Sequence, residues 1–70
     1  MKYAKVARKL LRLGCFERAR TAGTSHRRWI NQSNGKFTVV PEHGGREIDR
    51  KLLKNIVKQL GLSWDEFMNA

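Results

Sequence analysis

One histidine lies in a glycine-led segment with two arginines, Gly23-Thr24-Ser25-His26-Arg27-Arg28-Trp29. An imidazole takes up or releases a proton near neutral pH, because the ordinary pKa of histidine is about 6.5. Arginine side chains bind phosphate through paired N–H donors and stabilise the charge that develops on a reacting phosphate. A histidine together with such cations is the smallest set of side chains that could cleave RNA without a metal.

RNA cleavage of this kind needs a base for the 2′-hydroxyl proton, cations for the five-coordinate phosphate and an acid for the leaving 5′-oxygen. It is specific for RNA and leaves a cyclic phosphate. His26 is the candidate base or acid, and Arg27 and Arg28 are the candidate cations, with Ser25 as further support. His43 is the other imidazole. It either takes part in proton transfer or makes a hydrogen bond within its own glycine-rich turn. On the residues alone, a structural role explains either histidine as well as a catalytic role does.

The charge of the chain points to a polyanionic partner. Fifteen Lys and Arg against six Asp and Glu give a formal net charge of +9 over 70 residues. Residues 1–28 hold nine of these basic residues and one acid, a net +8, and the rest of the chain is close to neutral. Nucleic acid is favoured over an anionic membrane, because no segment has the long apolar run of a spanning helix.

Candidate RNA contacts follow from this charge. Basic side chains recur at helical spacing in the first segment, on a face that either binds the RNA backbone or keeps a small domain soluble. Trp29 either stacks on a base or packs in the core, and Gly23 serves a turn that lets a phosphate approach. The candidate RNA-binding residues are Lys5, Arg8, Lys9, Arg12, Gly23 and Lys36.

The single cysteine, Cys15, excludes an internal disulfide and indicates a reducing, cytoplasmic compartment. We interpret it as a small buried apolar residue. The spacing of Cys15, His26 and His43 matches no zinc pattern, so we expect neither a metal nor a cofactor. Charges interrupt the N-terminal segment too often for a signal peptide.

The pattern along the chain predicts a helix, three short strands and then one or two helices. The first helix has an apolar stripe and ends at Gly14, which supplies a left-handed cap. The stripe comprises Tyr3, Val6, Ala7, Leu10 and Leu11. The predicted strands are Cys15–Arg20, Ser25–Asn31 and Lys36–Pro41, and the turns between them are Thr21-Ala22-Gly23 and Ser33-Asn34-Gly35. Asn-Gly between two strand-like runs is a strong hairpin signal.

The C-terminal part predicts the remaining helices. Ser63-Trp64-Asp65-Glu66 has the form of a capping box and begins a short last helix, in which Trp64 and Phe67 either cover the core or offer an apolar contact to a protein partner. Before it, a broad apolar helix face ended by Gly61 is expected to be core. That face comprises Leu52, Leu53, Ile56, Val57 and Leu60. The order α-β-β-β-α, with a three-stranded antiparallel sheet and a short C-terminal helix, is an α+β fold.

Motifs in a fixed order from about Lys5 to Phe67 carry a resemblance to a known family. They are Leu10-Leu11-Arg12-Leu13-Gly14-Cys15-Phe16, Gly23-Thr24-Ser25-His26-Arg27, Val39-Val40-Pro41-Glu42-His43-Gly44, Glu47-Ile48, the run from Leu52 to Ser63, and Glu66-Phe67. The ordered set resembles the HicA family of toxin ribonucleases.

This resemblance implies a fold like that of a double-stranded-RNA-binding domain. It also implies the toxin of a type II toxin–antitoxin pair, which cleaves mRNA until a HicB-like antitoxin covers its active site. The family's catalytic histidine falls on His26, and Arg27 and Arg28 stand where members often have a second basic or histidine residue. Members often have a histidine near the place of His43. The length is typical of such a toxin, so we expect residues 1–70 to form one domain, and the oligomeric state is open, a monomer included.

Two other classes of function are weighed against this one. A non-catalytic RNA-binding module of the same fold also has a glycine-led turn that ends in histidine. Such modules generally have a lysine cluster where the second helix begins, whereas Arg46-Glu47-Ile48-Asp49-Arg50 contains two acids. A protein-interaction adaptor explains neither the N-terminal charge nor the placement of His26.

Overall fold

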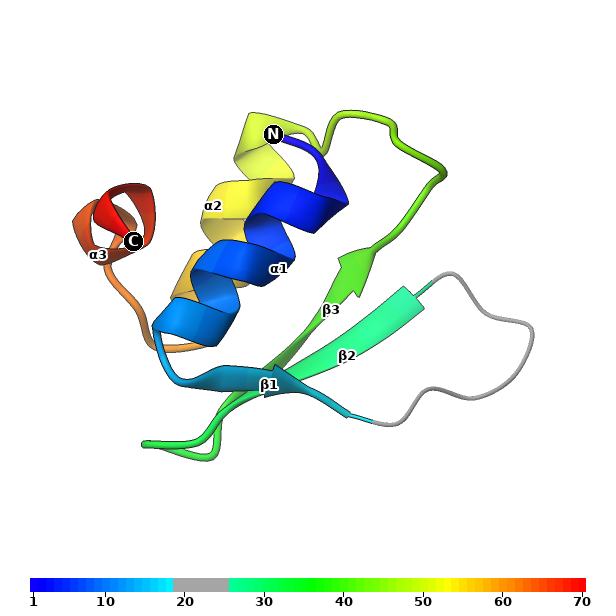
Figure 1. Ribbon diagram of the computed structural model, residues 1–70. Coiled ribbons are helices and arrows are strands. Elements are labelled where there is room, and N and C mark those ends of the chain that lie inside the picture. The colour runs from blue at the N-terminus through cyan, green and yellow to red at the C-terminus, as the bar shows by residue number, and fades with distance from the viewer. Residues whose placement is uncertain (19–25) are drawn as a thin grey trace.

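The computed structural model describes residues 1–18 and 26–70, with the helices on one face of a three-stranded sheet (Figure 1). The elements are α1 (Tyr3–Arg12), β1 (Cys15–Glu17), β2 (His26–Asn31), β3 (Phe37–Pro41), α2 (Arg50–Gln59) and α3 (Trp64–Asn69). Helix α1 packs over β1, α2 packs over β3, and α3 packs against both helices. This order confirms the predicted α+β fold.

Strand β2 lies in the middle of the sheet and pairs antiparallel with both neighbours. The register places Cys15 opposite Asn31 and His26 opposite Pro41. The predicted hairpin after β2 is confirmed: Gly35 has a φ of 73°, and its N–H donates to Asn31 O at 2.8 Å. A left-handed φ there favours glycine, which is why the Asn-Gly signal is informative.

Strands β1 and β3 are shorter than predicted. Strand β1 ends at Glu17, although the N–H of Arg18 still donates to Arg28 O at 2.8 Å. Strand β3 begins one residue late, at Phe37. The predicted end of the first strand, the turn after it and Ser25 fall within residues 19–25, outside the described residues.

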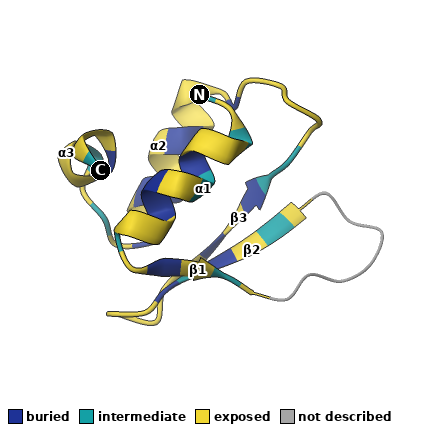
Figure 2. Cartoon of the chain, in the orientation of Figure 1, coloured by how far each residue is buried: buried dark blue, intermediate teal, exposed yellow. Residues whose placement is uncertain are grey.

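The core lies between the helices and the sheet face beneath them, as the dark blue segments of Figure 2 show. Trp29 is 2% exposed, and its Nε1 donates to Tyr3 Oη at 3.1 Å, which confirms core packing. Cys15 is also buried, as predicted, and burial raises the pKa of its thiol. Other buried apolar residues are Val6, Leu10, Val40, Ile48, Leu53, Ile56, Val57, Leu60 and Phe67.

Two leucines that the sequence assigned to apolar faces are exposed. Leu11 on α1 is 59% exposed and Leu52 on α2 is 41% exposed, so the prediction of Leu52 as core is wrong. A helix that lies on a single sheet buries a narrow stripe. Leu52 is one residue from the buried Leu53, a rotation of about 100° around the helix axis. It therefore lies on the flank of α2.

Lys9 does not share the exposed basic face predicted for α1. Its side chain is buried, and Nζ donates to Met68 O and Ala70 O, both at 3.0 Å. Nζ also lies 5.7 Å from the centroid of the Phe67 ring. The ammonium thus meets the carboxyl end of α3, where helix carbonyls carry partial negative charge. Lys9 joins α3 to α1.

The amino ends of α2 and α3 are capped by side chains. Asp49 accepts from the backbone N–H groups of Lys51 and Leu52. The predicted capping box is confirmed, because Ser63 Oγ accepts from Glu66 N at 3.0 Å and Glu66 Oε1 accepts from Ser63 N at 2.9 Å. These caps fix where both C-terminal helices begin.

The role of Lys9 is testable by stability. Lys9→Gln should lower the free energy of unfolding by about 1–3 kcal/mol, because two part-buried main-chain oxygens lose a charged donor. Arg8→Gln removes the same charge from an exposed neighbour and should change it by at most about 0.5 kcal/mol. Urea unfolding followed by circular dichroism measures both variants. Equal effects would contradict the placement of Lys9.

Candidate active site

His26 and His43 lie next to each other at one end of the sheet. His26 begins β2 and pairs with Pro41, the last residue of β3, and His43 follows two residues later. The two ring centroids are 6.4 Å apart, and the ring planes are inclined by 28°. Both residues are exposed. The fold thus brings together the two imidazoles of the chain.

The turn after β3 positions His43. Gly44 and Gly45 have φ values of 55° and 87°, which L side chains rarely adopt. The backbone N–H of Arg46 donates to the carbonyl oxygen of His43 at 3.1 Å and closes the turn. The backbone of His43 therefore holds this turn, and its imidazole lies against His26.

Arg28 shares the sheet face of His26, because alternate residues of a strand point to the same side. Its Cζ lies 5.5 Å from the centroid of the Phe37 ring. This face is opposite the helices and carries three exposed apolar side chains, Phe16, Phe37 and Val39. His26 and Arg28 therefore border an apolar sheet face that no described element covers.

Arg27 points to the opposite face, toward the helices. Nη1 donates to Glu17 Oε2 at 2.9 Å, and Nη2 donates to Glu42 Oε1. The hydrogen bond to Glu17, and after it the bond to Glu42, raises the pKa of the Arg27 guanidinium. Arg27 does not face the side on which His26 and Arg28 lie. It joins β1 to the segment that leads into the His43 turn.

A connected set of polar contacts continues from Arg27 to α1. Tyr3 Oη donates to Glu17 Oε1 at 3.3 Å and accepts from Trp29, and the Tyr3 ring lies 5.5 Å from Arg27 Cζ. Burial is the main cause that raises the pKa of Tyr3, and the nearby charge of Glu17 acts in the same direction. We name this set the Arg27 network. Its members are Tyr3, Glu17, Arg27, Trp29 and Glu42.

The other candidates are distributed over the molecule. Ser25 and Gly23 lie outside the described residues. Lys36 is exposed in the hairpin, at the end of β2 away from His26 and about 17 Å along the strand. Exposed basic residues at helical spacing remain on α1, which packs over β1. They are Lys5, Arg8 and Arg12.

Sequence reasoning missed a row of lysines on α2. Lys51, Lys54 and Lys58 are exposed and line a shallow groove of ≈ 490 Å³ with Leu52 and Asn55. Their spacing of three and four residues is the helical spacing already used for α1, and it could have found them. The apolar pattern of the same segment indicates only the buried side of the helix.

The two acids that precede α2 are both engaged in contacts. The carboxylate of Glu47 binds the N-terminal ammonium of Met1, which lowers the pKa of Glu47, and Asp49 caps α2. The ammonium of Met1 therefore offsets the charge of Glu47, whereas Asp49 has neutral N–H partners at the amino end of α2.

Neither a metal site nor a membrane span is found in the part of the chain that the structure describes. No group of three or more His, Cys, Asp and Glu residues within 1–18 and 26–70 is arranged to hold a metal ion. Among the same residues, no helix has the length and apolar character needed to cross a membrane.

Comparison with known proteins identifies a family. The family model described as the HicA toxin of bacterial toxin–antitoxin systems matches residues 3–62. A curated protein of Pseudomonas fluorescens (strain Pf0-1), named "Probable mRNA interferase HicA", is 62% identical over 29 residues, which are 41% of this chain. The match spans 48% of that relative, about half of its length. No solved structure matches significantly.

The Arg27 network predicts unequal effects of two neighbouring arginines. Arg27→Gln leaves Glu17 and Glu42 without their shared cation and should lower the melting temperature. Arg28→Gln, on the open face, should leave it nearly unchanged. Differential scanning calorimetry compares the two variants, and a larger decrease for Arg28→Gln would contradict the assignment of the faces.

The Tyr3 hydroxyl predicts a dependence of stability on alkaline pH. Because burial raises the pKa of Tyr3 in the folded state, the unfolded chain loses this proton at lower pH than the folded chain does. The associated stability is present below about pH 10 and is lost as the pH rises through the folded pKa. The free energy of unfolding should therefore fall more steeply above pH 10 in the wild type than in Tyr3→Phe. Parallel slopes in urea titrations would contradict this.

Proposed function

The chain belongs to the HicA toxin family of bacterial toxin–antitoxin systems, and we propose that it is a single-domain endoribonuclease that cleaves mRNA in the cytoplasm. The observation that carries the proposal is the pair of exposed imidazoles, His26 and His43, whose ring centroids are 6.4 Å apart. The name of the Pseudomonas fluorescens relative, an mRNA interferase, supports the choice of substrate.

The two imidazoles divide the acid and base work of the reaction. One ring accepts the proton of the 2′-hydroxyl as its oxygen attacks phosphorus, and the other donates a proton to the departing 5′-oxygen. The P–O5′ bond breaks as the O2′–P bond forms, so the products are a 2′,3′-cyclic phosphate and a 5′-hydroxyl. This division needs one neutral and one protonated imidazole, so the rate should have a bell-shaped dependence on pH.

We assign to Arg28 the stabilisation of the charge on the reacting phosphate. It lies on the face of His26, whereas Arg27 already binds two carboxylates under the helices. Its guanidinium lies over the Phe37 ring and would turn toward His26 to stabilise the charge on the phosphate. We assign Arg27 an indirect role, in which its bond to Glu42 holds the segment that carries His43.

We also propose that a HicB-like antitoxin is the protein partner. The apolar open face next to His26 supports this, since Phe16, Phe37 and Val39 are 42%, 59% and 41% exposed. A partner bound there would bury these side chains and block access to the histidines. Phe67, which the sequence left open as a partner contact, is fully buried in the core.

Removing either imidazole tests the reaction. The wild type should cut a defined mRNA in EDTA, and His26→Ala should slow cleavage by on the order of 10² to 10⁴, the usual contribution of general acid–base catalysis. His43→Ala should slow it by a comparable factor. RNA binding and the melting temperature of both variants should stay close to those of the wild type.

Three results would contradict parts of this proposal. Full activity of His43→Ala would exclude His43 as the second proton-transfer group. Products with a 5′-phosphate end would exclude attack by the 2′-hydroxyl. Tight RNA binding without cleavage by the wild type, also in ribosome-containing extract, would favour the non-catalytic RNA-binding module.

A further inference from the structure

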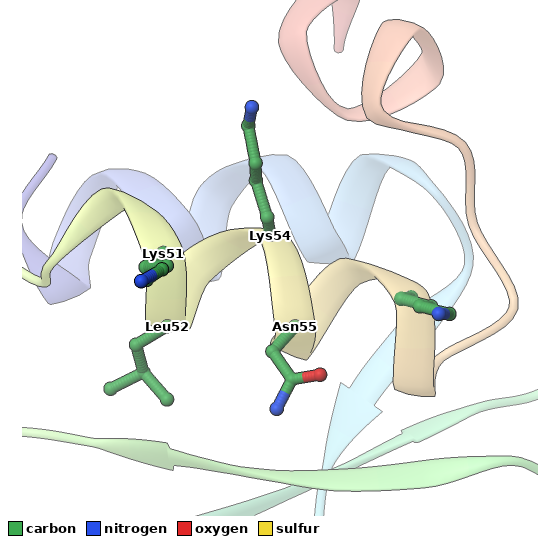
Figure 3. A pocket seen from close by; sticks show the side chains of 5 residues that line it. Lys51, Leu52, Lys54 and Asn55 are labelled. Carbon is green, nitrogen blue, oxygen red and sulfur yellow. The ribbon is translucent and has the colours of Figure 1, made fainter.

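The outer side of α2 has a shallow groove lined mostly by lysines. Figure 3 shows Leu52 and Asn55 extending toward the strand beneath the helix and Lys54 extending to the opposite side, so that they border the groove from both sides. Lys51 and Lys58 complete the lining. The groove therefore combines three ammonium groups with one apolar and one amide side chain.

Lys54 is held in place by an aromatic ring. Its Nζ lies 5.5 Å from the centroid of the Trp64 ring, and Arg50 Cζ lies 5.8 Å from the same centroid. Trp64 is only partly buried, and the two cations on its ring add to the positive potential along α2. An anion that binds in the groove thus meets cations that are partly ordered beforehand.

The groove continues toward the histidine pair. A second hollow of ≈ 220 Å³, at the amino end of α2, is lined by His43, Arg46 and Leu52 together with Pro41, Ile48 and the acids Glu47 and Asp49. Glu47 binds the N-terminal ammonium of Met1, and Asp49 caps the helix. Leu52 borders both hollows, so they adjoin on the flank of α2. Because His43 lies beside His26, the second hollow links the candidate active site to the end of the groove that Leu52 borders.

Among the described residues, the basic side chains of α1 line neither of these two hollows. Helix α1 packs over β1, the strand farthest from β3, whereas α2 packs over β3, whose end leads to His43. Lys9 is turned inward toward α3. The position of α2 therefore favours its lysines over the α1 face as the extension of the active site.

We propose that the α2 groove binds the sugar–phosphate backbone of one RNA strand whose scissile phosphate lies at His26 and His43. Lys51 and Lys58 are seven residues apart, which is about 10 Å along the helix axis. A short stretch of backbone that follows α2 therefore meets all three lysines. Contacts between lysines and phosphates read no base sequence.

This inference rests on the proposed ribonuclease function for the position of the scissile phosphate, but the binding of RNA in the groove is measurable without cleavage. The test uses the whole chain with His26→Ala, which keeps the RNA intact. The test variant adds Lys51→Gln, Lys54→Gln and Lys58→Gln. The matched control adds Lys5→Gln, Arg8→Gln and Arg12→Gln, which remove the same charge from α1.

The readout is the affinity for a short fluorescent single-stranded RNA over a range of salt concentrations. Each phosphate contact contributes about 0.7 to the slope of log K against log salt for a single strand. The α2 variant should therefore lose about 2 from this slope and bind at least about tenfold more weakly at low salt. The α1 control should keep most of the slope. Circular dichroism verifies that both variants fold.

The inference is overturned if the α2 variant keeps the slope, or if the α1 control loses as much. With His26 restored, the α2 variant should raise KM for mRNA and leave kcat nearly unchanged, since the lysines touch phosphates away from the reacting one. If the α2 variant loses this salt dependence but the wild type never cleaves RNA, the result supports RNA binding in the groove and rejects the ribonuclease function. If the wild type cleaves RNA but the α2 variant keeps the salt dependence of RNA binding, only the proposal for the groove is rejected.

Discussion

The antiparallel register of β2 on β3 is the constraint on which the rest of this structure depends. It places His26 opposite Pro41, so that the turn after β3 brings His43 to the histidine that begins β2. It also sets the faces of β2, with Trp29 in the core and Arg28 on the open side. A shift of one residue would exchange these faces and expose the tryptophan. Core packing and the geometry of the site are therefore set by the same hydrogen bonds.

Positive charge in this chain has structural as well as functional uses. Lys9 and Arg27 belong to the strongly basic N-terminal part, but both are turned inward, toward the end of α3 and toward two carboxylates. A buried cation requires such partners, because desolvation without them is costly. The net charge of the segment therefore overstates the number of exposed cations.

Three surfaces of the molecule differ in their chemistry. The end of the sheet carries the two imidazoles, the open sheet face carries exposed aromatic and aliphatic side chains, and the flank of α2 carries the lysine groove. The three surfaces adjoin near His26 and His43. An apolar partner surface and a polyanion could therefore be bound by different chemistry while both are close to the same reactive groups.

The sequence by itself determined what depends on neighbouring residues: the order of elements, the Asn34-Gly35 hairpin, the capping box at Ser63 and the buried stripe that includes Leu53 and Ile56. These features follow from local backbone preferences and from periodicity. It also singled out His26, since few residue types can transfer protons at neutral pH.

Only the tertiary structure decided that His43 lies beside His26, that Arg27 faces inward and that Leu52 lies in a groove. These outcomes depend on strand register and on which side of each element meets another. No pattern along a single chain segment contains that information, because the partners that bury or expose a side chain come from distant parts of the sequence.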